Sequence, residues 1–265
     1  MRDLHGKVAV VTGAAGGIGH ALCETFAAEG AHVVMADVDP VRLDAAAAQV
    51  DGDVLPVAAD VSIEDDVHAL AQRARERFGG VDILCNNAGV TLSARVWKLA
   101  PADMRWLLGI NLFGVLHGIR AFVPHMIERG APAHVVNTAS IGGLLGFPEI
   151  GAYTASKFAV VGLSESLLHD LRARRAPIDV SVLCPGTTST GLAENSRRLH
   201  GDDGPQRAPT ADGVEPDVIA ARVLHAIRER RFWILTHPGY ADLLERRHRA
   251  TLGADEELVA PGFFL

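Results

Sequence analysis

The stretch "KVAVVTGAAGGIGHAL", residues 7–22, decides the fold class of this chain. It begins with a continuous apolar run, 7–13, which is typical of a strand buried on both faces of a parallel sheet. A helical pattern over 17–29 follows, and glycines fill the turn between the two. A strand that passes through a glycine-rich turn into a helix predicts the first half of a βαβ unit.

The same alternation continues along nearly the whole chain. Further apolar runs predict strands at 32–37, 54–60, 81–87, 134–140, 178–186 and 232–236. Helical patterns predict helices at 40–49, 63–78, 101–128, 151–175 and 215–230, and Asp39-Pro40 and Ser62 mark two of their starts. Parallel strands joined by helices imply right-handed crossovers. We therefore predict an α/β fold, a Rossmann-type doubly wound parallel sheet of about seven strands with helices on both faces.

The size of the chain suits one large α/β domain or two small ones. It has 265 residues, of which 48% are hydrophobic and 22% are charged. The stretch 200–216 has the composition of a linker, but only one helix and one strand follow it. We therefore predict a single domain over residues 1–265, with 200–216 as part of a long loop.

Charge and cysteine usage exclude several classes of function. The net charge of −7 disfavours a nucleic-acid partner, which needs a basic face. The N-terminus has no signal-peptide pattern, and no apolar run approaches the ~20 residues of a membrane span. Cys23, Cys85 and Cys184 follow no metal-ligand spacing, so we predict core thiols and no metal site. Together these features predict a cytoplasmic protein without nucleic-acid or membrane partners.

The glycine cluster suits the binding of a dinucleotide. Gly13, Gly16, Gly17 and Gly19 allow a tight turn and a close approach of the backbone to a pyrophosphate. Their spacing, G-x-x-x-G-x-G, differs from the common G-x-G-x-x-G fingerprint. Asp37 ends the second predicted strand, 37 − 19 = 18 residues after Gly19. That separation is near the one expected for the acid that binds the adenosine ribose.

A carboxylate at this position favours NAD over NADP, because it accepts hydrogen bonds from both ribose hydroxyls and repels a 2′-phosphate. Val38 and Asp39 supply no cation, and His20 is only partly charged near pH ~7. The alternative for Asp37 is a turn or cap residue. Asp60 ends the third predicted strand, where it meets the adenine edge or caps the next helix.

Four features resemble a known family when they are read together. They are "TGAAGGIG" (12–19), "NNAG" (86–89), Ser140 two residues after Thr138, and "YTASK" (153–157). In this order they resemble the short-chain dehydrogenase/reductase family, in its single-domain NAD-dependent branch, over essentially the whole chain. The resemblance implies a catalytic tetrad of Asn111, Ser140, Tyr153 and Lys157.

The resemblance also extends the expected cofactor site. "PGTTST" (185–190) is similar to the family's P-G-x-V-x-T, with Thr188 where valine is usual and Thr190 placed to bond the nicotinamide carboxamide. "NNAG" is expected to line the adenosine side. The residues expected to bind NAD are Gly13, Gly16, Gly17, Ile18, Gly19, Asp37, Asp60, Val61, Asn87, Ala88, Gly89, Tyr153, Lys157, Pro185, Gly186, Thr188 and Thr190.

The tetrad predicts hydride transfer between NAD(H) and a secondary alcohol or ketone. Tyr153 and Lys157 lie on one helical face, and taken alone they could be an ordinary surface pair. A phenol with a pKa near 10 needs ~4 kcal/mol to titrate near pH ~7, and an ammonium ~4 Å away supplies about that much. We therefore expect Tyr153 to be the general acid/base and Lys157 to lower its pKa.

The other two members of the tetrad have supporting roles. Ser140 is expected to stabilise the substrate oxygen. The resemblance implies that Asn111 holds a water of a proton relay, and an interhelical hydrogen bond is the alternative for this side chain. Two other functions stay open: an NADPH-dependent 3-oxoacyl reductase, which Asp37 disfavours, and a dinucleotide-binding protein without turnover, which the tetrad disfavours.

A long segment after the sixth predicted strand, about 187–214, is expected to cover a hydrophobic substrate. Leu192 and Leu199 lie seven positions apart, which places them on one face of a short helix. The expected substrate residues are Ser140, Leu144, Ile150, Tyr153 and Leu192, with further apolar linings at Val96, Trp97, Leu145 and Phe147. An inward-facing Arg95, Arg197 or Arg198 would instead select an anion.

The predicted helices 101–128 and 151–175 carry apolar residues on more than one side. A helix that covers one face of a sheet needs one apolar stripe, so a second stripe indicates a partner. We expect a homotetramer, or failing that a dimer, and the family resemblance implies pairing through these same two helices.

Overall fold

The fold is an open parallel sheet, seen in a computed structural model that describes residues 1–201 and 213–253. Within these residues seven strands form one sheet in the order β3-β2-β1-β4-β5-β6-β7, and every neighbouring pair is parallel. The predicted doubly wound sheet is confirmed. The strands are β1 Val8–Thr12, β2 His32–Asp37, β3 Val54–Ala58, β4 Ile83–Asn86, β5 Ala133–Thr138, β6 Ile178–Cys184 and β7 Trp233–Leu235.

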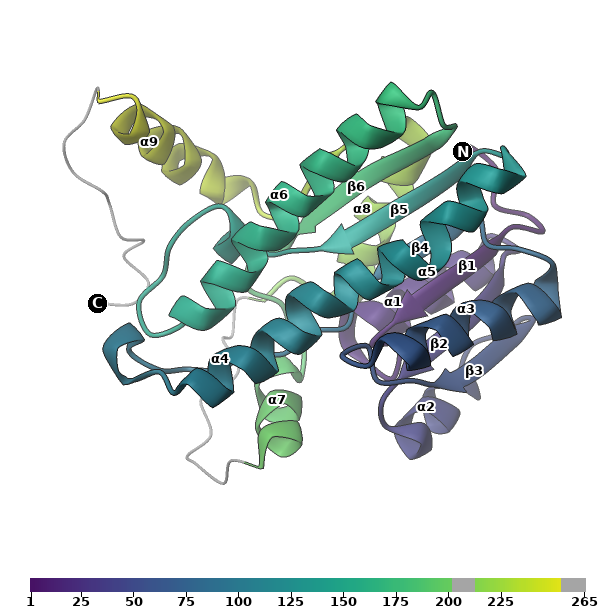
Figure 1. The fold of residues 1–265 in the computed structure, drawn as a ribbon, viewed down its shortest axis with the longest axis horizontal. Coiled ribbons are helices and arrows are strands. Elements are labelled where there is room, and N and C mark those ends of the chain that lie inside the picture. Colours follow the sequence, from purple (N-terminus) through teal and green to yellow (C-terminus); the bar gives the residue numbers. More distant parts are fainter. Residues whose placement is uncertain (202–212, 254–265) are drawn as a thin grey trace.

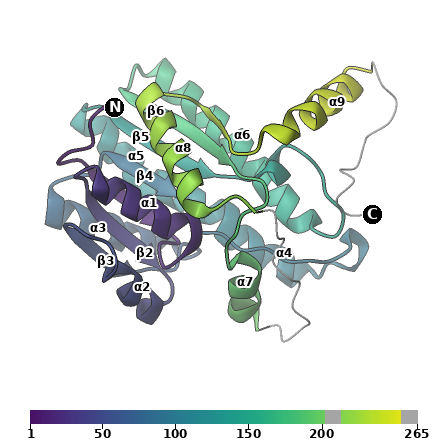
Figure 2. The ribbon, with the colours of Figure 1, turned by 180° about the vertical axis from the view of Figure 1, so that it is seen from behind.

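Helices cover both faces of the sheet, as the two opposite views show (Figures 1 and 2). α3, α5 and α6 lie on the face toward the viewer in Figure 1, and α1 and α8 lie on the face toward the viewer in Figure 2. The helices are α1 Gly17–Ala28, α2 Pro40–Ala47, α3 Glu64–Phe78, α4 Pro101–Leu108, α5 Gly114–Arg129, α6 Gly151–Ala173, α7 Leu192–His200, α8 Pro216–Glu229 and α9 Ala241–Thr251.

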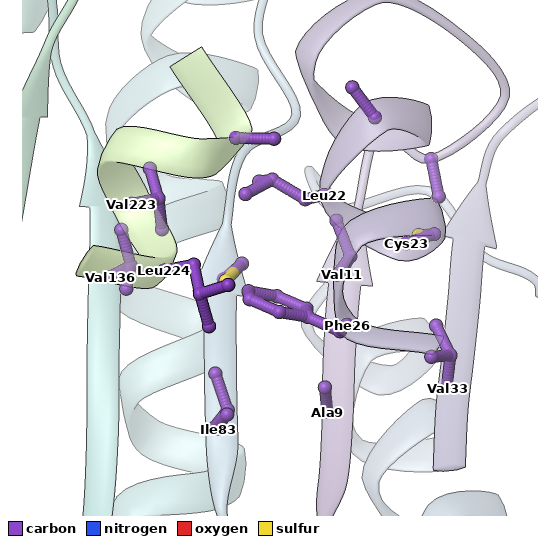
Figure 3. Close-up of a cluster of buried hydrophobic side chains, with 14 of the residues drawn as sticks. Ala9, Val11, Leu22, Cys23, Phe26, Val33, Ile83, Val136, Val223 and Leu224 are labelled. Atoms are coloured by element: carbon purple, nitrogen blue, oxygen red, sulfur yellow. The ribbon is translucent and has the colours of Figure 1, made fainter. Parts of the chain in front are cut away.

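The core fills the space between each helical layer and the sheet. On one face the ring of Phe26 lies against Leu224 and over Ile83, which joins α1, α8 and β4 (Figure 3). On the other face Phe122 and Met126 pack with strand residues in a second cluster. Burial of β1, β2, β4, β5 and β6 on both faces explains why their sequences show apolar runs instead of alternation.

The strand order creates a switch point between β1 and β4. The chain moves from β1 out to β3 and then returns to β4 on the other side of β1. Loops that leave the carboxyl ends of β1 and β4 therefore diverge to opposite sides of the sheet. In open α/β sheets, ligands bind in the crevice that such loops leave between them.

Two predicted helix boundaries differ from the structure. The helix predicted at 101–128 is three segments, because a π-helical turn at Gly109–Phe113 separates α4 from α5. Ser62 does not begin α3, which starts at Glu64. Asp39 is confirmed as the N-cap of α2, since its side chain accepts a hydrogen bond from Arg42 N at 3.1 Å.

The segment Pro101–Arg129 is long and apolar enough to cross a membrane by length and composition, at a mean hydropathy of 1.5. This is weak evidence for a span, because core helices of globular proteins pass the same test. Here Val115, Phe122 and Met126 pack into the core clusters. The segment therefore behaves as a helix that covers a sheet.

Candidate active site

The turn after β1 is closely packed and depends on glycine at two positions. Gly13 has a φ of +67°, and a Cβ atom there would lie 2.8 Å from Ala88 Cα. A Cβ atom on Gly19 would lie 2.1 Å from the carbonyl oxygen of Gly13. Thr12 Oγ1 accepts hydrogen bonds from Asn87 N at 2.9 Å and Ala88 N at 3.0 Å, which joins β1 to the segment after β4. The backbone at the switch point is therefore left bare for a ligand.

The two predicted acids each have a structural contact as well as a place at the site. Asp37 Oδ2 accepts a hydrogen bond from Ala15 N at 3.0 Å, and Asp37 Oδ1 accepts one from Asp39 N at 3.2 Å. Asp60 Oδ1 accepts from Ser62 N at 2.9 Å and from Ser62 Oγ at 2.7 Å. Both carboxylates also line the same cavity, so a structural contact and a place at the cavity coexist at each position.

That cavity, of about 340 Å³, runs from the end of β2 to the first turn of α6. Its size is within the range of small-molecule sites. The structure brings these sequence-predicted residues to its wall: Gly13, Gly16, Gly17, Ile18, Asp37, Asp60, Val61, Asn87, Ala88, Gly89, Tyr153, Lys157, Pro185, Gly186, Thr188, Thr190 and Leu192. Gly19 lies behind this wall, where it packs against Gly13.

Tyr153 and Lys157 lie at one end of the cavity on the first two turns of α6. Lys157 is buried, and its Nζ donates a hydrogen bond to the carbonyl oxygen of Thr138 at 2.8 Å. The same Nζ is 5.6 Å from the centroid of the Tyr153 ring. The ammonium is therefore near the phenol while a backbone carbonyl fixes its position.

Burial dominates the titration of both groups. It lowers the pKa of Lys157 from 10.5 to about 8. It raises the pKa of Tyr153, and the hydrogen bond with Ser140 opposes this increase. The expected fall of the Tyr153 pKa is thus not a property of the protein alone, because desolvation of the phenolate outweighs the interaction with Ser140. A further positive charge at the site would favour the phenolate.

Ser140 follows β5 and is buried with its hydroxyl in contact with backbone groups. Its Oγ accepts a hydrogen bond from Gly142 N at 3.0 Å and donates to the carbonyl oxygen of Pro185 at 3.3 Å. A Cβ atom on Gly142 would lie 3.4 Å from Tyr153 Cε1 and 3.5 Å from Ser140 Oγ, so the two side chains lie beside one another. Ser140 is not part of the cavity wall, and it reaches the site through Tyr153.

Asn111 is buried in the π-helical turn between α4 and α5. Its Oδ1 accepts from Val90 N at 2.8 Å, and its Nδ2 donates to Val90 O at 2.9 Å and Ser156 Oγ at 3.0 Å. A Cβ atom on Gly89 would lie 3.3 Å from Asn111 Oδ1 and 3.4 Å from Lys157 Nζ. Both polar groups thus converge on one glycine. π-helical turns of this kind are frequent at functional sites.

Besides Ser140, the structure places two more predicted substrate residues away from the cavity wall. Leu144 packs against a core cluster that includes Val115 and Val160. Ile150 precedes α6 and forms a backbone bridge with Ala94. Four other predicted linings are also absent from the wall: the exposed Val96 and Trp97, the buried Leu145, and Phe147.

The apolar wall is formed instead by Val90, Trp106, Ile110, Leu192 and Leu199. Leu192 and Leu199 both belong to α7, the short helix expected from their spacing. Trp106 and Ile110 were missed, although they lie four positions apart and so share one helical face. The part of the expected lid at 202–212 lies outside the described residues.

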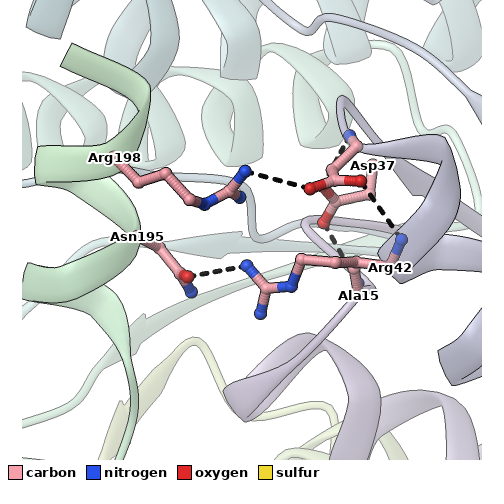
Figure 4. Close-up of polar contacts among 6 residues, drawn as sticks. Ala15, Asp37, Arg42, Asn195 and Arg198 are labelled. Atoms are coloured by element: carbon pink, nitrogen blue, oxygen red, sulfur yellow. Dashed lines mark hydrogen bonds and ion pairs between the residues drawn. The ribbon is translucent and has the colours of Figure 1, made fainter. Parts of the chain in front are cut away.

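Three polar residues line the other end of the cavity: Arg42, Asn195 and Arg198. Arg42 and Asn195 were missed, whereas Arg198 was considered in the sequence analysis as a residue that could turn inward. Arg42 lies in the first turn of α2, and the other two lie on α7. Figure 4 shows them facing one another beside Asp37. The one sequence signal was the position of Arg42 close after Asp37, whereas the approach of α7 depends on the tertiary fold.

Two other basic side chains considered from the sequence, those of His20 and Arg95, do not line the cavity. His20 Nε2 lies 3.2 Å from the carbonyl oxygen of Ala46, and the residue is not in the cavity wall. Arg95 Nε lies 3.4 Å from Glu149 Oε1. Cys23, Cys85 and Cys184 are buried and free. Across residues 1–201 and 213–253, no group of three or more His, Cys, Asp or Glu side chains is arranged to hold a metal ion.

Comparison with known proteins identifies relatives over nearly the full length. Residues 7–200 match the family model described as short chain dehydrogenase. A CLA biosynthesis dehydrogenase/reductase of Lactiplantibacillus plantarum is 36% identical over 284 aligned positions, which cover 99% of each protein. A 1-deoxy-11-beta-hydroxypentalenate dehydrogenase of Streptomyces exfoliatus is 37% identical over 88% of this chain and 84% of that protein.

A solved structure is similar to the same extent. A short-chain dehydrogenase/reductase from Burkholderia phymatum, in complex with NAD, superposes with a TM-score of 0.92 at 38% identity, over 98% of this chain and 99% of that one. The parallel sheet, the glycine turn at its switch point and these full-length matches agree. This chain is a member of the short-chain dehydrogenase/reductase family.

Proposed function

We propose that this protein is an NAD(H)-dependent oxidoreductase that interconverts a hydrophobic secondary alcohol and the corresponding ketone. The observation that carries the proposal is a single cavity with the glycine turn and Asp37 at one end and Tyr153 and Lys157 at the other. Family membership supports the reaction type, since the relatives are dehydrogenases and reductases.

NAD fits the residues that line the cavity. The turn at Gly13 has no room for a side chain, as a pyrophosphate-binding backbone requires. Asp37 provides the carboxylate for the adenosine ribose and opposes a 2′-phosphate. The Burkholderia relative was solved in complex with NAD, which supports the same cofactor here. NAD⁺ accepts a hydride, and it adds the positive charge that the titration of Tyr153 requires.

In the oxidation direction Tyr153, as the phenolate, takes the hydroxyl proton of the substrate. The C–H hydride leaves the carbinol carbon for the cofactor, and the C–O single bond becomes C=O. Ser140 Oγ lies beside Tyr153, so rotation of its hydroxyl away from the Pro185 carbonyl would let it donate to the substrate oxygen as charge develops on that oxygen. In the reduction direction Tyr153 returns the proton.

Lys157 and Asn111 lie on the path by which the proton taken by Tyr153 would pass to solvent. Lys157 Nζ and Asn111 Oδ1 approach the same glycine, Gly89. A water between them would join Tyr153 to solvent through polar groups. The bonds of Asn111 with Val90 and Ser156 also join the π-helical turn to α6, so the structural alternative for Asn111 coexists with this role.

Two alternatives make different predictions. An NADPH-dependent 3-oxoacyl reductase would bind NADPH more tightly than NADH, which Asp37 opposes. A dinucleotide-binding protein without turnover would bind NADH but reduce no ketone, which the proximity of Tyr153, Lys157 and Ser140 opposes. Rates with NADH and NADPH, measured beside direct binding of both, separate the three functions.

The substrate class follows from the apolar wall of Trp106, Ile110, Leu192 and Leu199. Each buried methylene of a substrate contributes ~0.8 kcal/mol in such surroundings. We therefore propose that kcat/KM rises with the apolar area of the substrate. A panel of alcohols and ketones of increasing size, followed by NADH absorbance, tests this. A preference for small anions would contradict it.

We further propose a cytoplasmic, single-domain homotetramer over residues 1–265, with 187–214 as the substrate lid. The exposed ring of Phe113 and the half-buried Phe158 and Leu163 support pairing through α5 and α6. Light scattering at micromolar concentration tests the assembly, and a monomer mass would contradict it.

A further inference from the structure

α7 is attached to the rest of the domain chiefly by polar contacts. Within this helix, all of which the structure describes, Ser196 is the one buried residue. Its Oγ accepts a hydrogen bond from Thr91 N at 2.9 Å, and His200 Nε2 lies 3.1 Å from Asp103 Oδ1. A helix held by polar contacts, with little apolar burial, can separate from the domain at a small cost in free energy.

Two further contacts join α7 to α2 beside the cofactor cavity. Arg42 Nη1 donates to Asn195 Oδ1 at 2.6 Å, and Arg198 Nη1 donates to Asp39 Oδ2 at 3.0 Å. We call this pair of contacts the α2–α7 latch. Figure 4 shows Arg42, Asn195 and Arg198 next to the hydrogen bond that Ala15 N donates to Asp37. Arg42, Asn195 and Arg198 all line the cavity at the end where Asp37 lies.

We infer that α7 is a wall of the cofactor site as well as of the substrate pocket, and that the α2–α7 latch retains NAD(H). The inference rests on the proposed NAD(H) site, because the end of the cavity at Asp37 is where the adenosine half binds. A helix that crosses this end limits how the cofactor leaves. Release of NAD(H) then requires the latch to open.

α7 contributes residues to both the substrate pocket and the proposed cofactor site. Leu192 and Leu199 form part of the apolar wall, and Asn195 and Arg198 lie on the same helix. Opening of the latch therefore removes apolar substrate contacts and cofactor contacts together. Closure over bound cofactor completes the substrate pocket.

Three variants isolate the latch from general electrostatics. Asp39→Asn removes the partner of Arg198 but keeps an N-cap for α2, because asparagine caps as well as aspartate. Arg198→Ala and Asn195→Ala remove the α7 side of each contact, and alanine maintains the helix. Exposed ion pairs contribute little, so each charge variant should release NADH about two- to fivefold faster. Asn195→Ala should release it about three- to tenfold faster.

Asp39→Asn gives the sharpest result. Loss of a negative charge near an anionic cofactor would by itself slow the release of NADH, whereas an opened latch accelerates it. Stopped-flow displacement of bound NADH by excess NAD⁺, followed by NADH fluorescence, measures the rate. The double variant Asp39→Asn/Arg198→Ala should release NADH no faster than the faster single variant, since both remove one contact.

Glu194→Gln is the matched control. Glu194 is an exposed residue of α7 that lies outside the cavity wall, so the Glu194→Gln variant should release NADH at the rate of the wild type. Unchanged release in Arg198→Ala and Asn195→Ala, slower release in Asp39→Asn, or additive effects in the double variant would each overturn the latch. If the wild type bound no NADH, the proposed function itself would fail, which is a distinguishable outcome.

Discussion

Replacement of Lys157 by Met should stabilise the protein while it abolishes turnover. Burial lowers the pKa of Lys157 from 10.5 to about 8, so the buried ammonium destabilises the fold near neutral pH. At 1.36 kcal/mol per pKa unit this corresponds to about 3 kcal/mol. Methionine fills a similar volume without charge, but it leaves the Thr138 carbonyl without its donor, at a cost of about 1 kcal/mol. The expected net gain is about 2 kcal/mol in the free energy of unfolding.

The pH dependence of this gain distinguishes the burial of a charge from ordinary packing. Between about pH 8 and the unfolded pKa of 10.5, the unfolded chain binds more protons at Lys157 than the folded chain. Stability of the wild type therefore rises with pH through this window, and the advantage of Lys157→Met falls by about 2 kcal/mol from about pH 7 to about pH 9.5. Urea denaturation at both pH values measures it. A destabilised variant, or an advantage that does not change with pH, would refute the reasoning.

Three further changes test the cofactor and substrate ends of the cavity. We expect the wild type to prefer NAD over NADP by at least about tenfold in kcat/KM, or ~1.4 kcal/mol, and Asp37→Ser should reduce this ratio. Equal kcat/KM for both cofactors in the wild type would contradict the binding of the ribose by Asp37. Gly19→Ala should lower the free energy of unfolding by about 1–3 kcal/mol and weaken NADH binding, because the added Cβ meets Gly13 O at 2.1 Å. Gly16→Ala should lower the free energy of unfolding by less, because its Cβ meets only the end of the Arg42 side chain at 3.4 Å. Leu192→Ala should raise the KM of an apolar substrate more than it lowers kcat, and an unchanged KM would remove α7 from the substrate pocket.

The strands and the glycine turn could be predicted because local sequence determines them. Each strand is a largely apolar run whose limits lie within two residues of the prediction, and β1, β2, β4, β5 and β6 are largely buried on both faces. The turn needs Gly13 and Gly19 because a side chain there would meet backbone. Such requirements are written directly in the residues at those positions.

The π-helical turn at Gly109–Phe113 could not be predicted in the same way. The apolar pattern continues without a break through 101–128, so hydrophobic periodicity indicates one helix. The turn is marked by contacts of the Asn111 side chain with Val90 and Ser156, which are distant in the sequence. Asn111 itself was predicted from the resemblance. The only local sign was an asparagine in the middle of a predicted helix, where this residue is unfavourable.

The pocket linings show the same limit. Leu144 and Ile150 flank the predicted catalytic residues in sequence, but the side chain of Leu144 packs in the core and the backbone of Ile150 pairs with Ala94 in the segment after β4. Arg42, Asn195 and Arg198 meet because α7 folds back onto α2, more than 150 residues earlier in the chain. Proximity in sequence therefore predicted the catalytic end of the site better than its walls.

Tyr153→Phe tests the central claim most directly, because it removes one oxygen atom from the cavity. NADH binding by fluorescence titration and ketone reduction by NADH absorbance should be measured on the same preparation of the variant and the wild type. The account predicts NADH binding within about twofold of the wild type and a rate below about one hundredth of it, the contribution expected of a general acid/base. Tyr153→Phe with more than about a tenth of the wild-type rate would contradict the assignment of Tyr153 as the group that exchanges the proton with the substrate.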